Sequence, residues 1–208
     1  MIAIIDYGVG NLFSLQSSFA AIGAKAVVTA DPTVIRRADR ILLPGVGAFK
    51  DAARKLEDSG MAALVREQAA AGKPIMGICL GMQLLLDVSY EYGEHKGLGL
   101  IEGKVVPIRD VVPADYKVPH IGWNGLHLCG TEHPLFKYVQ EGDCVYFVHS
   151  YYATDCPSVI ATTEYHAALT AAVAKDNVMG CQFHPEKSGD VGLNILRAFC
   201  EMGGTKNG

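Results

Sequence analysis

Short apolar runs alternate with helical patterns through the first half of the chain. Apolar runs with the length of buried strands occupy residues 2–5, 26–28, 41–43 and 74–78. Between them, apolar residues recur at three- and four-residue spacing, as on one face of a helix, in residues 12–22, 62–71 and 80–86. Short apolar strands that alternate with helices predict a parallel sheet covered on both faces. Ligands of such sheets bind beyond the carboxyl ends of the strands.

The second half of the chain is richer in strand patterns. Candidate strands cover residues 104–108, 120–127, 145–148, 159–163 and 178–183, and a last helix is expected over residues 191–199. We therefore expect an α/β fold, with a mostly parallel, doubly wound sheet flanked by helices and a strand-rich second half. Because no repeat or long linker divides the chain, residues 1–201 are expected to form a single domain and residues 202–208 a C-terminal tail.

Composition and charge narrow the range of functions. Among 208 residues, 18 basic and 22 acidic side chains give a net charge of −4, which argues against broad nucleic-acid binding. No apolar run approaches the roughly 18 residues of a membrane span, and the first residues lack the basic segment of a signal peptide. The cysteines form no C-x-x-C pair, and no cluster has metal-ligand spacing. We expect a soluble cytoplasmic protein with neither metal nor cofactor.

One cysteine stands in a position typical of a nucleophile. Residues 77–81 (GICLG) have the form G-x-nucleophile-x-G at the point where a predicted strand passes directly into a helix. In such an elbow the backbone is strained and the flanking glycines keep other side chains away from Cys79. The start of the helix favours a thiolate, and the amide of Leu80 can face a developing oxyanion. The alternative is a structural cysteine buried in a tight junction.

A thiolate nucleophile needs a base that is itself oriented, and His184 is the best candidate. It follows the predicted strand 178–183, and Glu186 lies two residues further on, on the same side of an extended segment. Pro185 stiffens this segment, so the carboxylate can fix the imidazole tautomer. The alternative is a surface turn with a chance acid. Glu164 and His166 have the same spacing but fit one face of a half-exposed strand.

Two glycine-rich turns lie at the carboxyl ends of predicted strands. Residues 44–47 (PGVG) end the third strand, beside the fourth, and either supply a second oxyanion donor or form a plain turn. Residues 8–10 (GVG) lack the third glycine of a dinucleotide-binding fingerprint, since Phe13 stands there, and are interpreted as a turn.

Three segments together resemble the class I, or triad, glutamine amidotransferases. They are residues 44–47 (PGVG), 77–83 (GICLGMQ) and 182–186 (QFHPE). Their order and spacing cover most of the chain, and the combination is far more specific than any one segment. The resemblance implies a flavodoxin-like fold and a glutaminase that hydrolyses L-glutamine to glutamate and ammonia through a cysteine thioester.

Further segments resemble, within this class, the glutaminase subunits of imidazole glycerol phosphate synthases of histidine biosynthesis. They are residues 6–12 (DYGVGNL), 118–124 (VPHIGWN), 147–151 (FVHSY) and 186–188 (EKS). In that group the ammonia passes to a cyclase subunit that forms imidazole glycerol phosphate and AICAR. The resemblance therefore implies a heterodimer with a cyclase of (β/α)8 barrel type.

The resemblance also implies roles for single residues. Cys79 attacks the side-chain amide of glutamine, His184 transfers protons, and Glu186 orients His184. The oxyanion hole consists of the amides of Val46 and Leu80. The implied glutamine contacts are Gly47, Gln83, Glu91, His149, Ser150 and Tyr151, and the implied partner-interface residues are Asn11, Trp123, Tyr146 and Lys187.

Three other functions stay open on the sequence. The first is the glutaminase subunit of another synthase, on the anthranilate, aminodeoxychorismate or pyridoxal phosphate route, although residues 123–124 and 186–188 argue against it. The second is a γ-glutamyl cysteine hydrolase that needs no partner. The third is a non-catalytic binding module on the same scaffold, against which the intact Cys79, His184 and Glu186 speak.

Overall fold

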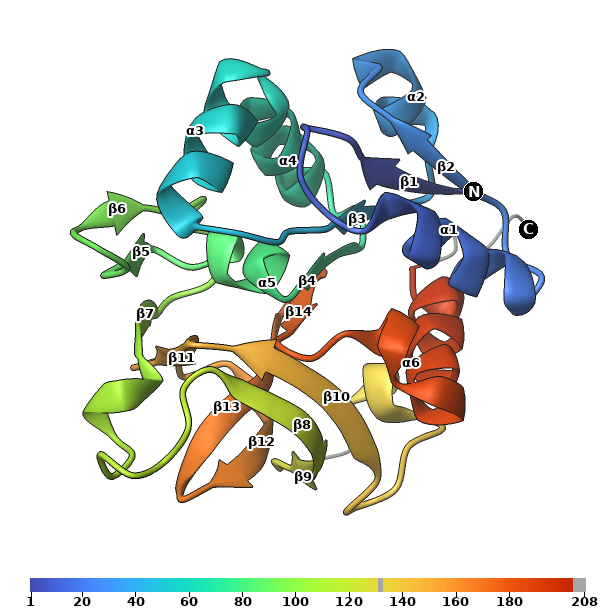
Figure 1. The fold of residues 1–208 in the computed structure, drawn as a ribbon. Coiled ribbons are helices and arrows are strands. Elements are labelled where there is room, and N and C mark those ends of the chain that lie inside the picture. The colour runs from blue at the N-terminus through green and yellow to red at the C-terminus, as the bar shows by residue number, and fades with distance from the viewer. Residues whose placement is uncertain (131–132, 204–208) are drawn as a thin grey trace.

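The structure is a computed structural model that describes residues 1–130 and 133–203 (Figure 1). Its centre is an eight-stranded sheet with the order β2, β1, β3, β4, β14, β13, β12, β9. Neighbours from β2 to β14 are parallel, and neighbours from β14 to β9 are antiparallel. In this order the strands span Ala26–Thr29, Ile2–Ile5, Arg40–Leu43, Ile75–Ile78, Val178–Cys181, Ala167–Lys175, Val159–Tyr165 and His127–Leu128. The expected α/β sheet is thereby confirmed.

Helices cover both faces of the parallel part of the sheet (Figure 1). One face carries α2 (Pro32–Arg37), α3 (Phe49–Asp58), α4 (Met61–Ala70) and α5 (Leu80–Leu85), and the other carries α1 (Leu12–Ala21) and α6 (Gly189–Glu201). Successive side chains of a strand point to opposite faces, so Ala3 packs in the first layer and Ile4 in the second. Both are fully buried, which explains why β1 has no polar position.

Two smaller sheets extend the strand-rich half. One pairs β8 (His120–Gly125) antiparallel with β10 (Cys144–His149). The other has the order β11 (Tyr151–Thr154), β7 (Lys104–Pro107), β5 (Val88–Ser89) and β6 (His95–Lys96). Figure 1 shows β8 and β10 in front of β12 and β13. Single-turn 3₁₀ helices occupy Ile108–Asp110 (η1), Pro134–Phe136 (η2) and Pro185–Lys187 (η3).

The pairing of β4 with β14 joins the two halves of the chain. These strands run parallel, with Cys181 opposite Ile78. Just beyond this pair, the backbone N–H of Cys79 donates to the carbonyl oxygen of Cys181 (2.8 Å). The residues that follow β4 and those that follow β14 therefore meet at one edge of the sheet.

The helix α3 and the strand β13 are the longest elements without a counterpart among the expected ones. In α3 only Phe49, Ala52 and Leu56 are buried, so its apolar stripe is too sparse to stand out in the sequence. The long strand β13 is rich in alanine, which has a weak preference for strands. It forms because it lies between β12 and β14 and pairs with both.

Two expected strands have wrong boundaries. The strand expected over residues 120–127 is divided into β8 and β9, which belong to different sheets, and the buried Leu126 lies between them. The strand expected over residues 178–183 ends at Cys181. Apolar patterns persist where the chain stays buried, whether or not it still pairs as a strand.

Met202, the first residue of the expected tail, contacts β3. The carbonyl oxygen of Met202 accepts a hydrogen bond from Arg40 Nε (2.8 Å). Residues 204–208 of the expected tail lie outside the described residues. Within residues 1–130 and 133–203, no helix combines the length and apolar character needed to cross a membrane.

Candidate active site

Cys79 stands at a strained junction between β4 and α5. Its backbone angles, φ 55° and ψ −114°, lie in the positive-φ region that a non-glycine residue rarely adopts. The turn is this tight because α5 packs directly on the strands. A Cβ atom on Gly81 would collide with the carbonyl oxygen of Leu43, so only glycine fits there. The side chain of Cys79 is thus fixed at the carboxyl edge of the sheet, with 8% of the residue exposed.

His184 and Glu186 form a buried pair beyond the end of β14. The Nδ1 atom of His184 lies 2.8 Å from Glu186 Oε1, and the two side chains are 4% and 1% exposed. Glu186 belongs to the 3₁₀ turn η3, so a turn brings the two side chains together, not the alternation of an extended segment. The expected pair is present, but the geometry from which it was expected is wrong.

The backbone of His184 is anchored from both sides. Its N–H donates to the carbonyl oxygen of Tyr146 on β10 (2.9 Å), and its carbonyl oxygen accepts from the hydroxyl of Ser188 (2.6 Å). The same hydroxyl oxygen accepts the N–H of Tyr146 (3.0 Å). Ser188 therefore joins the histidine segment to β10, a role that the sequence analysis did not assign.

The surroundings of His184 favour its charged form. Burial by itself lowers the pKa of the imidazole, but hydrogen bonds and charges of Cys79 and Glu186 outweigh burial and raise it to about 9. His184 is therefore an imidazolium at neutral pH, beside the sulfur of Cys79. This arrangement can deliver a proton to a leaving group while a thiolate attacks.

The glycine-rich turn after β3 lies against the elbow. A Cβ atom on Gly45 would come within 2.6 Å of the amide nitrogen of Gly81, so the turn packs directly on the start of α5. The buried hydroxyl of Tyr7 donates to the carbonyl oxygen of Pro44 (2.7 Å) and holds the turn from behind. Val46 and Leu80 then line one cavity with Cys79.

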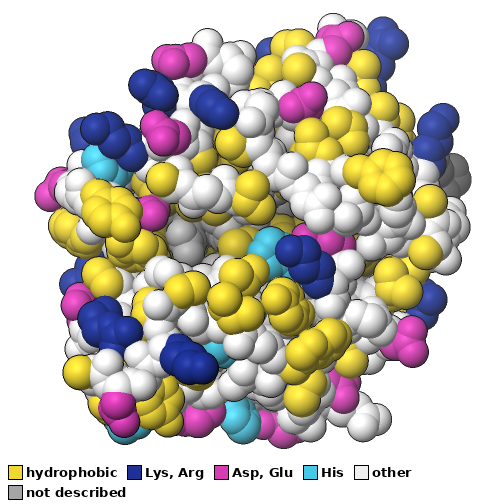
Figure 2. Space-filling model, in the orientation of Figure 1, with side chains coloured by type: hydrophobic (Ala, Val, Ile, Leu, Met, Phe, Trp, Pro, Cys, Tyr) yellow, Lys and Arg dark blue, Asp and Glu magenta, His cyan; other side chains and the backbone are white. Residues whose placement is uncertain are grey.

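That cavity has a volume of about 570 Å³, within the range of small-ligand sites. It contains Cys79 and His184 together with every residue expected to contact glutamine: Gly47, Gln83, Glu91, His149, Ser150 and Tyr151. Lys187, expected at the partner interface, lies at the same cavity. Figure 2 looks onto this face and shows a hollow near its middle, with hydrophobic side chains around it.

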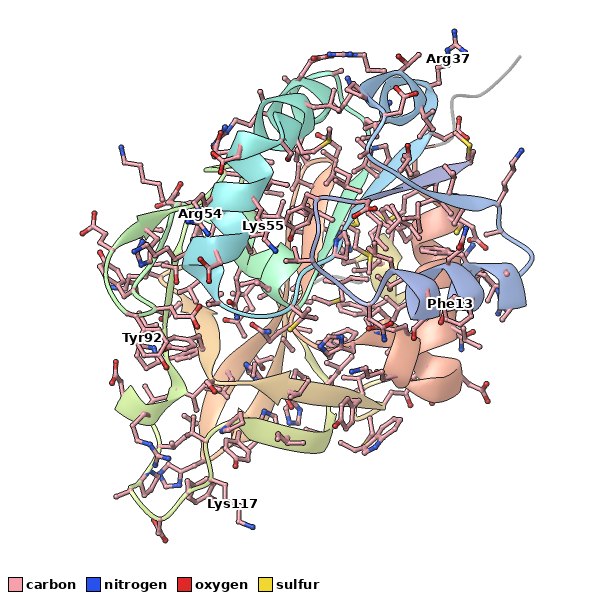
Figure 3. The ribbon with its side chains drawn as sticks, turned by 45° about the horizontal axis from the view of Figure 1, so that its top comes forward. Phe13, Arg37, Arg54, Lys55, Tyr92 and Lys117 are labelled. Atoms are coloured by element: carbon pink, nitrogen blue, oxygen red, sulfur yellow. The ribbon has the colours of Figure 1, made fainter. Side chains whose placement is uncertain are left out.

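Glu91 connects the cavity to α3. One carboxylate oxygen, Oε2, accepts the first N–H of α3, from Phe49 (2.7 Å). Such a contact satisfies one of the unpaired donors at a helix start and favours a negative charge there. The neighbouring Tyr92 lies at the cavity with φ 53°, 87% exposed, its ring 6.3 Å from that of Tyr151 (Figure 3).

A second buried cluster joins two histidines, His149, which lines the cavity, and His120. His149 Nδ1 lies 2.9 Å from the carbonyl oxygen of Tyr151, and His149 Nε2 lies 3.0 Å from His120 Nδ1. Because a carbonyl oxygen only accepts, Nδ1 of His149 is the donor. His120 Nε2 continues the chain to Asn124 Oδ1 (2.9 Å). Both strands that carry these residues pair in the β8–β10 sheet, with His149 opposite His120.

Another residue missed by the sequence analysis touches the sulfur. Gln182, fully buried, directs its Nε2 atom at Cys79 Sγ over 3.7 Å. It lies inside the segment QFHPE that carries part of the family resemblance. The sequence alone gives no sign that it contacts Cys79, because the contact depends on the pairing of β14 with β4.

Of the expected partner-interface residues, Lys187 lines the cavity, and Trp123 and Lys187 both lie close to Tyr146. Trp123, 55% exposed, meets the ring of Tyr146 edge-on at 5.9 Å, and Lys187 Nζ lies 5.9 Å from the same ring. Asn11 directly precedes α1, from which Phe13 projects into solvent with 80% exposure (Figure 3). Trp123, Tyr146 and Lys187 thus form a cluster of mixed polar and aromatic character.

Comparison with known proteins agrees with this geometry. A family model, "Glutamine amidotransferase class-I", matches residues 3–202. The chain is 49% identical to "Imidazole glycerol phosphate synthase subunit HisH" of Lactococcus lactis subsp. lactis, over 96% of this chain and 98% of that protein. It is 52% identical to the protein of the same name from Sulfurimonas denitrificans, over 96% of this chain and 97% of that one.

Solved structures show the same fold at low sequence identity. One described as "Crystal structure of glutamine amidotransferase" matches with a TM-score of 0.74 and 17% identity over 96% of this chain and 100% of that chain. The "Structure of PurLQS from Thermotoga maritima" matches with a TM-score of 0.70 and 20% identity over 96% of both chains. The family resemblance read from the sequence is confirmed: this chain belongs to the class I glutamine amidotransferases.

Proposed function

We propose that this protein is the glutaminase subunit of an imidazole glycerol phosphate synthase in histidine biosynthesis. It hydrolyses L-glutamine to glutamate and ammonia and passes the ammonia to a cyclase subunit, which forms imidazole glycerol phosphate and AICAR. The names of relatives that share about half of this sequence over nearly its whole length support the assignment. The observation that carries the chemistry is a cysteine on a strained elbow beside a buried histidine–glutamate pair.

The reaction begins with attack of the Cys79 thiolate on the side-chain carbonyl carbon of glutamine. The negative charge that develops on the carbonyl oxygen meets the amides of Leu80 and Val46. The His184 imidazolium, whose pKa of about 9 keeps it charged, gives its proton to the departing nitrogen. Ammonia leaves and a thioester on Cys79 remains.

Hydrolysis of the thioester restores the enzyme. The imidazole, now neutral, takes a proton from a water molecule as the oxygen attacks the thioester carbon. Collapse of the second tetrahedral intermediate expels the Cys79 thiolate and gives glutamate. Glu186 holds the ring in one orientation through Nδ1 throughout both steps (2.8 Å).

Glutamine binds in the cavity in front of Cys79. Its contacts are Gly47, Gln83, Glu91, His149, Ser150 and Tyr151, which all line that space. The carboxylate of Glu91, 9% exposed, suits the α-ammonium group of the substrate. A cavity of this size accommodates glutamine and the water needed for thioester hydrolysis.

The partner is a cyclase subunit of (β/α)8 barrel type, bound at the face that carries Asn11, Trp123, Tyr146 and Lys187. Support comes from the exposed aromatic side chains of Trp123 and Phe13, since exposed aromatic groups are enriched at protein interfaces. Docking here covers the mouth of the cavity, so that ammonia does not escape to solvent. The cytoplasmic location stays a prediction from the sequence.

The test follows the amide nitrogen of glutamine. Glutamine labelled with ¹⁵N at the side-chain amide is supplied to the chain alone, and to the chain with the cyclase subunit and its phosphoribulosyl formimino substrate. We expect ¹⁵N in the imidazole product with the cyclase present, and its loss in the variant Cys79→Ala. The matched control is Cys144→Ala, which removes an exposed thiol away from the cavity.

Other outcomes favour the alternatives. Rapid release of free ¹⁵N-ammonia without any partner favours a γ-glutamyl hydrolase. Transfer of the label into the product of another synthase, and not into an imidazole, identifies a different partner. Full activity of Cys79→Ala in the assembled enzyme excludes the thioester mechanism.

A further inference from the structure

The buried amide of Gln182 lies between two residues of the active site. Its Oε1 atom accepts from Gln83 Nε2 (2.9 Å), and its own Nε2 lies 3.7 Å from Cys79 Sγ. Gln83 Nε2 also donates to the backbone carbonyl of Tyr151 (3.2 Å). The contacts therefore run without interruption from the glutamine cavity at Tyr151, through Gln83 and Gln182, to the sulfur.

The direction of every hydrogen bond in this chain follows from its first member. A carbonyl oxygen has no hydrogen to give, so the atom of Gln83 that faces Tyr151 is the amide nitrogen. That nitrogen also faces the side chain of Gln182, which must therefore present its oxygen to Gln83. The remaining end of the Gln182 amide, which faces the sulfur, is then the NH₂ group.

We propose that Gln182 is a further catalytic residue, which donates a hydrogen bond to the Cys79 sulfur and stabilises it as a thiolate. The inference rests on the proposed role of Cys79 as the nucleophile. A donor favours the anionic form of its acceptor, and the effect grows away from water. Gln182 is fully buried and Cys79 nearly so, so the donor acts on the sulfur away from bulk water.

The same chain determines what Gln83 offers to a substrate. Both hydrogens of its amide nitrogen are used, one by Tyr151 and one by Gln182. The side chain therefore meets the substrate through Oε1, which can only accept. Such an acceptor pairs with a donor of glutamine, its ammonium or its amide NH₂ group. Gln182 thus couples substrate orientation to the state of the nucleophile.

The test measures the pH dependence of Cys79 alkylation by iodoacetamide, which reacts with the thiolate. Peptide mass spectrometry separates Cys79 from the other cysteines. In Gln182→Met, a side chain of similar length without a donor, we expect the half-maximal pH of alkylation to rise by about one unit. At pH 7 the alkylation rate of Cys79 then falls about five- to tenfold.

Two further variants separate a lost donor from a disturbed fold. Gln182→Glu keeps the shape and the acceptor for Gln83 but faces the sulfur with a carboxylate, so the half-maximal pH should rise at least as far. Gln68→Met, the control, removes another buried glutamine amide from α4, away from the cavity, and leaves the profile of Cys79 in place. A rise in Gln68→Met equal to that in Gln182→Met overturns the inference, because loss of packing would then explain it.

The outcomes distinguish this inference from the proposed function. If Cys79 of the unaltered protein reacts no faster at pH 7 than the exposed Cys144, the nucleophile assignment itself fails. If Cys79 is the fast cysteine and its profile stays in place in both Gln182 variants, the nucleophile stands and the role of Gln182 is refuted. In the complex with the cyclase, a supported inference also predicts a roughly tenfold lower kcat for Gln182→Met.

Discussion

Two buried histidines, His184 and His149, line one cavity, and their pKa values shift in opposite directions. Burial lowers the pKa of both, but His184 has a carboxylate and a thiol as partners, which raise its pKa to about 9. His149 has a carbonyl oxygen and a second imidazole, and burial takes its pKa down to about 3, only partly opposed by the hydrogen bond to Tyr151. Charge on the partner, not depth of burial, decides which imidazole is cationic at neutral pH.

This difference in charge gives the imidazoles of His184 and His149 different roles. An imidazolium beside a sulfur can move protons during the reaction, and a neutral imidazole that donates to a backbone carbonyl holds a loop in place. The following predictions are ordered from the largest expected effect to the smallest.

Removal of each ring should separate proton transfer from positioning. His184→Ala should lower the glutaminase kcat about 10³- to 10⁴-fold. His149→Ala should lower kcat/KM about tenfold, mainly through a higher KM. Glutamate formation in the complex with the cyclase measures both. The control His166→Ala, an exposed histidine, should be unaffected. Equal losses in kcat for His184→Ala and His149→Ala would remove the functional distinction.

Loss of the carboxylate should make His184 resemble His149. In Glu186→Gln the amide no longer stabilises the imidazolium, so the pKa of His184 should fall from about 9 and kcat should drop about 10²-fold. NMR titration of the ring protons and steady-state rates measure the two effects. Glu94→Gln changes an exposed carboxylate and serves as the control. An unchanged titration of His184 would assign its raised pKa to Cys79 alone.

The free energy of unfolding should fall at alkaline pH because of His184 and at acid pH because of His149. The raised pKa of His184 contributes stability that is complete below pH 6.5 and is lost as the pH rises through about 9. The lowered pKa of His149 contributes stability present above pH 6.5 that is lost as the pH falls towards about 3.

Each contribution is of the order of 3–5 kcal/mol, and urea unfolding at a series of pH values measures them. Relative to the unaltered protein, Glu186→Gln should flatten the alkaline limb and leave the acid limb, whereas His149→Asn should flatten only the acid limb. If Glu186→Gln alters the acid limb as strongly as the alkaline one, the two clusters are not independent.

The far end of the second cluster should matter least. Asn124→Ala removes the partner of His120 Nε2 and should cost about 1 kcal/mol of unfolding free energy. Because no carboxylate is disturbed, the pKa of His184 should not move. Urea unfolding and the same NMR titration test this, and a shift at His184 would show that the clusters communicate through the cavity wall.

The sequence by itself determined the local parts of this protein. The apolar runs predicted the strands of the parallel half, and the segment GICLG predicted a nucleophile at a strand–helix junction. These features depend on residues next to one another in the chain, so the pattern carries them. The same holds for the family, which the order of three short segments indicates.

Only the tertiary structure decided which distant side chains meet. The pairing of β4 with β14 places Gln182 against Cys79, and the pairing of β8 with β10 places His120 beside His149. Neither contact has a signal in the neighbouring residues, because hydrogen bonds between strands far apart in sequence are fixed by register. The charge state of His184 was equally beyond the sequence, since burial and partner charge act in opposite directions and their balance depends on distances.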